Sequence, residues 1–155
     1  MHDHRLQNAE TNETKCFVTF DISGQLFGIP ITRVQDILTP DTIAAVPGGP
    51  AEVRGLINLR GRIVTVIDVH TLLSLKGSRD GIRGMCITVE SRGESYTLLV
   101  DSVGDVTTVP GELRDHNPAT FDQVWQDVTD GVYRTDRGLL VALNVDRLLA
   151  IEPKH

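Results

Sequence analysis

The sequence predicts an all-β protein made of two small five-stranded β-barrels, related by an internal duplication and accompanied by short helices. Three observations lead to this prediction. Short apolar runs alternate with turn residues along most of the 155-residue chain, which is typical of strands joined by tight turns. Helical periodicity is confined to brief stretches. The second half of the chain also repeats the order of apolar runs found in the first half.

The first strand is predicted to begin at Cys16, after a polar segment. Residues 1–14 have no apolar periodicity, so we expect them to form a flexible tail. From Cys16 to Phe20 the side chains alternate between two faces, and both faces are largely apolar. Residues 23–25, "SGQ", then supply a turn into a second strand that ends near Pro30.

The most apolar part of the chain is predicted to be a β-hairpin. Its two strands, "GLINL" and "RIVTVIDV", are joined across residues 60–62, where Gly61 provides the permissive backbone that a tight turn needs. The surrounding predictions are a break at "PGGP" (47–50), one possible helical turn at "AEVRG" (51–55), a short helix at "HTLLSL" (70–75) and a loop at "KGSRDGIRG" (76–84).

The duplication is visible as two ungapped self-alignments. Residues 16–37 align with 85–106, and residues 55–73 align with 131–149, with a connector that is seven residues longer in the second half. We therefore predict one domain over residues 15–155, in which two barrels of roughly 15–80 and 81–150 share a core. Barrels of this size are SH3-like or OB-like, and they close their own sheet edges.

Composition and charge exclude several classes of function. The formal net charge is −6 and only 5% of the residues are aromatic, whereas nucleic-acid binding needs a basic footprint and stacking platforms. The two cysteines fall in apolar runs and are interpreted as buried free thiols of a reducing cytoplasm. The N-terminus has no apolar core, and no run is long enough to span a membrane. We expect a cytoplasmic protein that neither binds nucleic acid nor inserts into a membrane.

The repeat separates positions that serve the fold from positions that are free to serve function. Gly55 and Gly131 align and are predicted to be structural. Asp36 aligns with Asp105, which favours a turn or capping role, although a partner contact stays open. In contrast, Asn58, Arg60 and Arg62 align with Arg134, Asp136 and Gly138. A register slipped by one residue would instead align Arg60-Gly61 with Arg137-Gly138 and weaken the contrast.

The arginines beside the hairpin turn have two interpretations. Exposed, solvated charge is the commoner explanation for any single arginine. Alternatively, the apolar strands hold the hairpin rigid and its rim presents guanidinium groups, with five donors each, to a partner.

"VRGLINLRGRIVTVIDV" resembles the signature hairpin of CheW-like domains, the adaptor modules of bacterial chemotaxis, and "FVTFDISGQLFGIPITRVQDI" resembles the opening of the same domain. The resemblance covers residues 16–149. It implies two small β-barrels around a shared core. It also implies an adaptor that binds the cytoplasmic tip of methyl-accepting chemoreceptors and the regulatory domain of a CheA-type histidine kinase. The sequence has Asp36 where many relatives have Glu, and Thr65 where many have Pro.

The resemblance and the hairpin analysis together define a predicted partner-binding site. Its members are Val34, Asp36, Asn58, Arg60, Gly61 and Arg62.

The sequence lacks the sets of residues that catalysis or cofactor binding would need. Asp68 and His70 would share a face if they lay on a strand, but no nucleophile is spaced to complete a triad. His2 and His4 have no partners with metal-ligand spacing. We therefore expect no enzyme activity, no cofactor and no metal. Oligonucleotide binding by a β-barrel and hydrolysis by a small enzyme remain as alternative functions. The first would need a basic, aromatic surface and the second a catalytic set of residues, and the sequence shows neither.

Overall fold

The computed structural model describes residues 14–40, 43–45, 47–75 and 84–150. The predicted tail falls almost wholly outside these residues, and so does most of the predicted loop at 76–84. The strands are β1 (Thr14–Ile22), β2 (Gln25–Pro30), β3 (Val34–Leu38), β4 (Val53–Leu59), β5 (Arg62–Asp68), β6 (Met85–Ser91), β7 (Glu94–Val100), β8 (Ser102–Pro110), β9 (Thr129–Thr135) and β10 (Gly138–Leu143). The helices are η1 (Ile31–Arg33), α2 (Val69–Leu72), η2 (Gly111–Leu113), α3 (Gln123–Val128) and α4 (Val145–Leu149).

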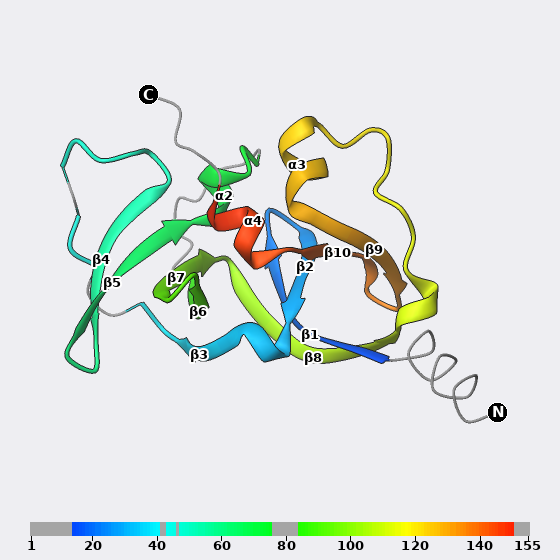
Figure 1. The fold of residues 1–155 in the computed structure, drawn as a ribbon, viewed down its shortest axis with the longest axis horizontal. Helices are drawn as coiled ribbons and strands as arrows, with labels where there is room; N and C mark the ends of the chain where they lie inside the picture. Colours follow the sequence, from blue (N-terminus) through cyan, green and yellow to red (C-terminus); the bar gives the residue numbers. More distant parts are fainter. Residues whose placement is uncertain (1–13, 41–42, 46, 76–83, 151–155) are drawn as a thin grey trace.

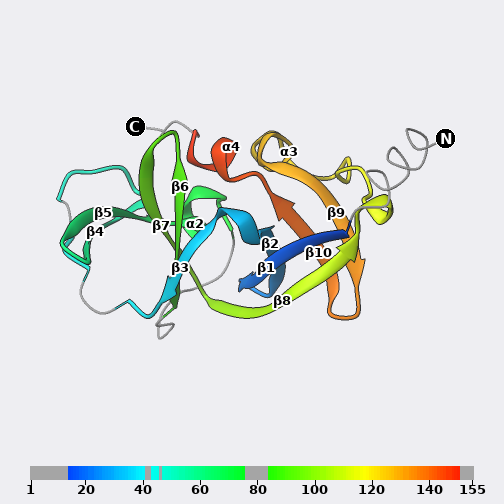
Figure 2. The ribbon, with the colours of Figure 1, turned by 60° about the horizontal axis from the view of Figure 1, so that its bottom comes forward.

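The strands form two five-stranded sheets that lie side by side (Figure 1). Sheet A has the order β8-β1-β2-β10-β9, and sheet B has the order β3-β6-β7-β5-β4. The predicted all-β class with two five-stranded units is confirmed. The predicted boundary near residue 80 is wrong for the sheets, because each sheet takes strands from both halves of the chain. β3 and β8 cross from one unit to the other (Figure 2).

Each sheet is closed into a barrel by a single isolated bridge. Ala44, which follows β3, pairs with Leu56 of β4, and Asp115, which follows β8, pairs with Val132 of β9. These bridges join the two edges of each sheet order and so remove part of the exposed edge. The two closures occupy equivalent places in the repeat, which explains why the barrels look alike despite low sequence identity.

Gly55 and Gly131 lie beside these closing bridges. Their φ angles are 155° and 147°, in a region that L-residues rarely adopt. A Cβ atom at Gly55 would also collide with the backbone of Ala44, and one at Gly131 would lie 2.6 Å from Arg114 Cγ. The expectation that both glycines serve the fold is therefore confirmed, because each allows the closing segment to approach the sheet.

The internal repeat matches the structure element by element. Strands β1 to β3 correspond to β6 to β8, and the β4–β5 hairpin with α2 corresponds to the β9–β10 hairpin with α4. The register also shifts at equivalent places, between Val53 and Gly55 in one hairpin and between Ala142 and Leu143 in the other. Such paired irregularities are inherited features of a duplicated unit rather than local accidents.

The apolar core has three parts. A central cluster, which includes Phe20, Phe27, Ile87 and Leu98, draws buried side chains from both sheets. One smaller cluster lies within sheet A and its barrel, around Phe17 and Tyr133. Another lies within sheet B, around Val64, Val66 and Cys86. The predicted shared core is thus present between the barrels, and because strands alternate their faces, each barrel also fills its own interior.

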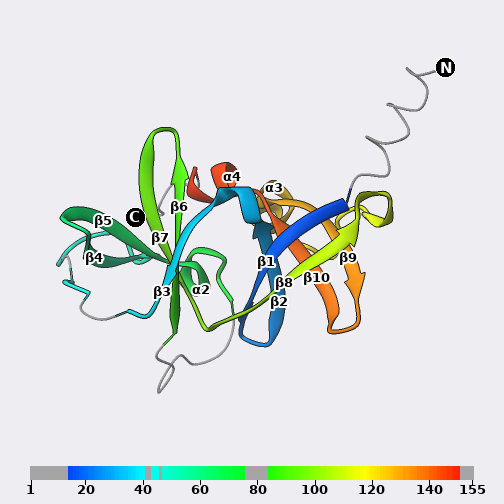
Figure 3. The same ribbon diagram turned by 90° about the horizontal axis from the view of Figure 1, so that it is seen from below.

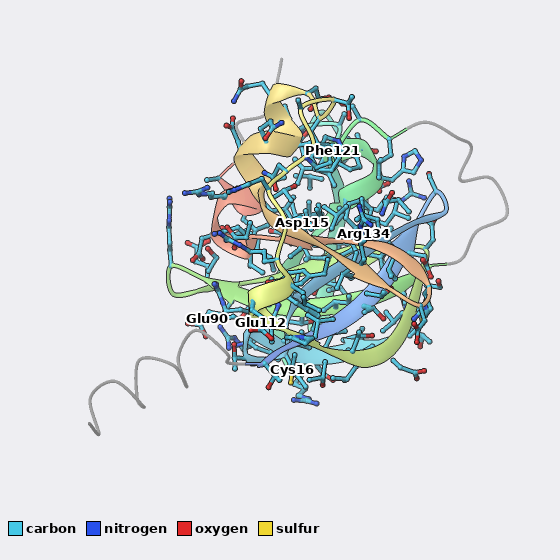
Figure 4. The ribbon with its side chains drawn as sticks, turned by 90° about the vertical axis from the view of Figure 1, so that its right-hand side faces the viewer. Cys16, Glu90, Glu112, Asp115, Phe121 and Arg134 are labelled. Carbon is cyan, nitrogen blue, oxygen red and sulfur yellow. The ribbon has the colours of Figure 1, made fainter. Side chains whose placement is uncertain are left out.

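The connector between β8 and β9 covers one end of the central cluster. Figure 4 labels Glu112, Asp115 and Phe121 along it, at the end of the molecule formed by sheet A. Trp125 packs on that core from helix α3. The possible helical turn at residues 51–55 is absent, because Val53 already belongs to β4 and pairs with Ile67.

Candidate functional site

The rim of the β4–β5 hairpin is a two-residue turn formed by Arg60 and Gly61. Leu59 and Arg62 are the last paired residues, and both turn residues have positive φ, 54° for Arg60 and 84° for Gly61. This conformation matches the right-handed twist of the strands, and Asn-Gly is its usual sequence. Here Asn58 acts from outside the turn, where its Oδ1 accepts a hydrogen bond from Gly61 N at 2.9 Å.

Arg60 reaches from this turn to β3, on the opposite edge of sheet B. Its Nη2 lies 2.9 Å from Asp36 Oδ2, and the other carboxylate oxygen of Asp36 accepts a hydrogen bond from Ile37 N at 2.9 Å. The Arg60 side chain is 80% exposed and that of Asp36 is 28% exposed. Because an ion pair this exposed contributes little stability, its main effect is to orient the guanidinium group.

The structure brings only some of the predicted residues into contact. Asp36 and Arg60 form the ion pair, while Asn58 and Gly61 shape the turn. Arg62 is exposed on β5 without contributing to either interaction. Val34 lies at the start of β3, is partly buried and packs against the central core.

The corresponding hairpin of sheet A has a different rim. Thr135 pairs with Gly138, so the ungapped alignment of Arg60 with Asp136 is confirmed and the slipped register is not adopted. Among residues 135–138 only Gly138 has a positive φ, 113°. Thr135 Oγ1 accepts a hydrogen bond from Arg137 N and donates one to Gly138 O. The two hairpins share their fold and length. Of these two, only the β4–β5 hairpin has an arginine at positive φ, which is Arg60.

Comparison with known proteins adds an independent finding. The family described as CheW-like domain matches residues 16–152, which include both hairpins and every strand except the first two residues of β1. The chain belongs to the CheW-like domain family.

Similar proteins are found along the full length of this CheW-like chain. It is 25% identical over 154 residues to "Chemotaxis protein CheW" of Treponema pallidum, covering 97% of this chain and 91% of that protein. It is 28% identical over 133 residues to "Probable chemotaxis protein CheW" of Rhizobium etli, covering 86% of each. The crystal structure of scaffolding protein TtCheW from Thermoanaerobacter tengcongensis superimposes with a TM-score of 0.79 and 26% identity over 90% of both chains.

Two exposed aliphatic side chains accompany the Arg60–Asp36 pair in this CheW-like domain. Ile37 on β3 is 41% exposed and Ile63 on β5 is 66% exposed. Their equivalents in the repeat, Val106 and Leu139, are exposed as well. The sequence did not reveal these four side chains as exposed, because apolar residues in strands are expected to face a core. Only the exposure of Ile63 could have been expected from the sequence. Ile63 lies next to the charged turn, and residues at the end of a strand are less covered than those in its middle.

The residues considered for catalysis have structural roles in the CheW-like fold. Asp68 caps α2, where its Oδ1 accepts a hydrogen bond from His70 N at 3.1 Å, and it lies 3.9 Å from Arg54. His70 lies on α2, in agreement with the short helix predicted at residues 70–75, so it and Asp68 do not share a strand face. Burial raises the pKa of Cys86 to about 11, which keeps it a thiol near neutral pH.

The described residues were also searched for other kinds of site. They contain no group of three or more His, Cys, Asp or Glu side chains arranged to hold a metal ion. Over the same residues, no helix is long and apolar enough to cross a membrane. Phe17, Phe20, Phe27 and Tyr133 are buried, so these rings are not available as stacking platforms for bases.

Proposed function

We propose that this CheW-like protein is a noncatalytic adaptor that couples chemoreceptors to a CheA-type histidine kinase. Its partners would be the cytoplasmic tip of methyl-accepting chemoreceptors and the regulatory domain of the kinase. Such an adaptor works in the cytoplasm, at receptor arrays on the inner face of the membrane. The observation that supports it most is the oriented, exposed Arg60 beside Asp36 on the rim of sheet B.

The chemistry of this rim suits a protein partner. Asp36 occupies one donor of Arg60, which leaves further guanidinium donors for carboxylate or carbonyl groups of a partner. Ile37 and Ile63 add exposed apolar surface on the two strands that flank the pair. Protein interfaces combine apolar surface with polar groups, and arginine is enriched in them.

The rigidity of the rim also favours binding. The left-handed turn and the Asn58 hydrogen bond fix the backbone at Arg60, and the Asp36 ion pair favours one direction of its side chain before a partner arrives. A side chain that is ordered in advance loses less conformational entropy on binding. The strain of a non-glycine residue at positive φ is then part of the site, since it aims the side chain along the rim.

Substitution of Arg60 by glutamate tests this function directly. We expect Arg60→Glu to fold normally, with a change in stability within about 0.5 kcal/mol, because the side chain is exposed. The new carboxylate would repel Asp36 and an acidic or carbonyl-rich partner surface. A receptor–adaptor–kinase complex, measured by co-sedimentation with receptor-containing membranes, should therefore fail to assemble.

Asp136→Arg is the matched control, because it changes the equivalent turn position in sheet A. We expect this variant to retain more complex than Arg60→Glu. Circular dichroism distinguishes loss of fold from loss of binding. Full assembly by a folded Arg60→Glu protein would show that the rim of sheet B is not the contact surface.

A further inference from the structure

A polar network lies where the two barrels meet, at the entrance to β3. Arg33, the last residue of η1, donates from Nη2 to Asp146 Oδ1 at 2.8 Å and from Nη1 to Oδ2 at 3.2 Å. Its Nη2 also donates to Glu90 O at 2.7 Å, and Ser91 Oγ donates to Asp146 Oδ1 at 2.7 Å. The two parallel bonds between Arg33 and Asp146 form a bidentate pair, the strongest geometry available to these groups.

The network joins elements that are far apart in the chain. Arg33 lies immediately before β3, and Ser91 is the last residue of β6 in sheet B. Asp146 lies in the first turn of α4, which follows β10 of sheet A. Figure 3 shows α4 beside the segment that leads into β3. The hydrogen bonds from Arg33 and Ser91 lower the pKa of Asp146 to about 2, so the carboxylate stays charged at neutral pH.

The network joins the two repeat units at one place and has no counterpart at the place related to it by the repeat. The positions equivalent to Arg33, Ser91 and Asp146 are Ser102, Ile22 and His70, and these residues have no comparable ion pair. The barrel fold therefore does not require it. As with Arg60, a contact that occurs at only one of two places related by the repeat is free to serve a particular task.

Apart from the partly buried Val34, apolar side chains do little to hold the entrance to β3. η1 has no buried residue. A cavity of about 510 Å³ opens beside it, lined by Thr32, Arg33, Gln35, Glu90, Arg92 and Asp146. β3 itself is an edge strand of sheet B that pairs with β6. A short edge strand next to open space depends on its polar contacts for a defined position.

β3 is thus fixed by side-chain contacts at two points. The Arg33 network holds its entrance, and the Asp36–Arg60 pair holds its middle. Between them, Gln35 Nε2 donates to Glu90 Oε2 at 3.0 Å. Displacement of the entrance would move Asp36 and with it the guanidinium group of Arg60.

We propose that Arg33, Ser91 and Asp146 are positioning residues that hold β3 in the place where it contacts a partner. This inference rests on the proposed function, because β3 matters in this way only if its surface binds a partner. Arg33 and Asp146 act through the strand and need not touch the partner themselves.

The test compares Arg33→Gln, Arg33→Lys and Asp146→Asn with the wild-type protein. Arg137→Gln is the matched control, because Arg137 forms an ion pair of similar exposure with Asp21 in sheet A, 3.5 Å long and remote from β3. Three quantities are measured: amide hydrogen exchange of residues 34–38, the melting temperature, and the affinity for the purified regulatory domain of a CheA-type kinase from the same organism.

We expect Arg33→Gln and Asp146→Asn to remove most of the exchange protection of the β3 amides, with no matching change in sheet A. Affinity should fall by about threefold, as expected when the binding-competent position of β3 is populated about a third of the time. Arg33→Lys keeps the charge but not the bidentate geometry, so it should restore part of the exchange protection of β3 and part of the affinity for the kinase domain. Arg137→Gln should change neither the exchange of the β3 amides nor the affinity for the kinase domain.

Several results would overturn the proposal. Unchanged exchange of β3, or faster exchange with unchanged affinity, would show that the network does not position a binding strand. An equal rise of exchange in both sheets would show a purely structural role. If the wild-type protein does not bind the kinase domain, the proposed function fails, and the exchange data alone then decide whether the network orders β3.

Discussion

At the scale of single residues, Gly55 and Gly61 lie on one hairpin and are required for different physical reasons. Gly61 has a φ of 84° and no atom within 4 Å of the place a Cβ would take, so only backbone strain opposes a side chain there. Gly55 combines a φ of 155° with contact against the Ala44 backbone at the barrel closure. A substitution at Gly55 therefore meets both strain and collision.

We expect Gly61→Val to lower the free energy of unfolding by about 1–3 kcal/mol, because a β-branched residue is strained at positive φ. Gly55→Ala should cost more, about 2–4 kcal/mol, since the closing bridge must also move. Urea unfolding of both variants, with Arg62→Val as a control at an exposed strand position, measures the difference. A larger loss at Gly61 than at Gly55 would mean that the turn, and not the closure, limits the fold.

At the scale of elements, the long connector of the second repeat unit forms a cover over the core between the barrels. Asp122 begins α3 by accepting a hydrogen bond from Trp125 N at 3.0 Å. The Trp125 ring packs 5.5 Å from Phe27 and 5.1 Å from Phe121, measured between ring centroids. Its Nε1 donates to Leu73 O at 3.2 Å, at the end of α2. The additional residues of this connector thus tie the second repeat unit to the first.

Two substitutions of Trp125 separate these contributions. Trp125→Phe keeps an aromatic ring but loses the hydrogen bond to Leu73 O, so we expect a loss of about 1 kcal/mol in unfolding free energy. Trp125→Ala also removes the ring packing and should cost about 3–5 kcal/mol. Thermal unfolding followed by circular dichroism compares them. Equal losses of unfolding free energy in the two variants would indicate that the hydrogen bond dominates and that packing of the ring contributes little.

At the scale of the whole molecule, the exchange of strands makes the two repeat units dependent on each other. Strands β1 and β2 complete sheet A with β8, β9 and β10, while β3, β4 and β5 complete sheet B with β6 and β7. Neither half of the chain contains a complete sheet, and the central cluster draws on both sheets. Duplication therefore produced one cooperative domain rather than two.

Expression of residues 1–80 and 81–155 as separate fragments tests this dependence. We expect each fragment alone to be largely unfolded, because each one exposes strand edges and half of the central core to water. Mixing the two should restore the native far-UV circular dichroism spectrum and a single complex on size-exclusion chromatography. A cooperative unfolding transition of residues 1–80 alone would contradict this expectation.

Local patterns in the sequence predicted the first two strands and the hairpin at Arg60-Gly61, and the repeat predicted structural roles for Gly55 and Gly131. Alternation and turn chemistry act over a few residues, so they can be interpreted without knowing which strands pair. The repeat also predicted two equivalent units. It could not show that the units exchange strands, because the pairing of β1 with β8 and of β3 with β6 depends on long-range contacts.

Tertiary structure alone decided which side chains meet at the candidate site. Asp36 and Arg60 were each predicted from local motifs, but their ion pair spans 24 positions and forms because the two edges of sheet B curl toward each other. Arg33 and Asp146 are 113 positions apart and were not singled out, since no local pattern relates a short helix after β2 to the start of α4. Contacts of this kind arise only when packing of the core between the barrels brings distant elements together.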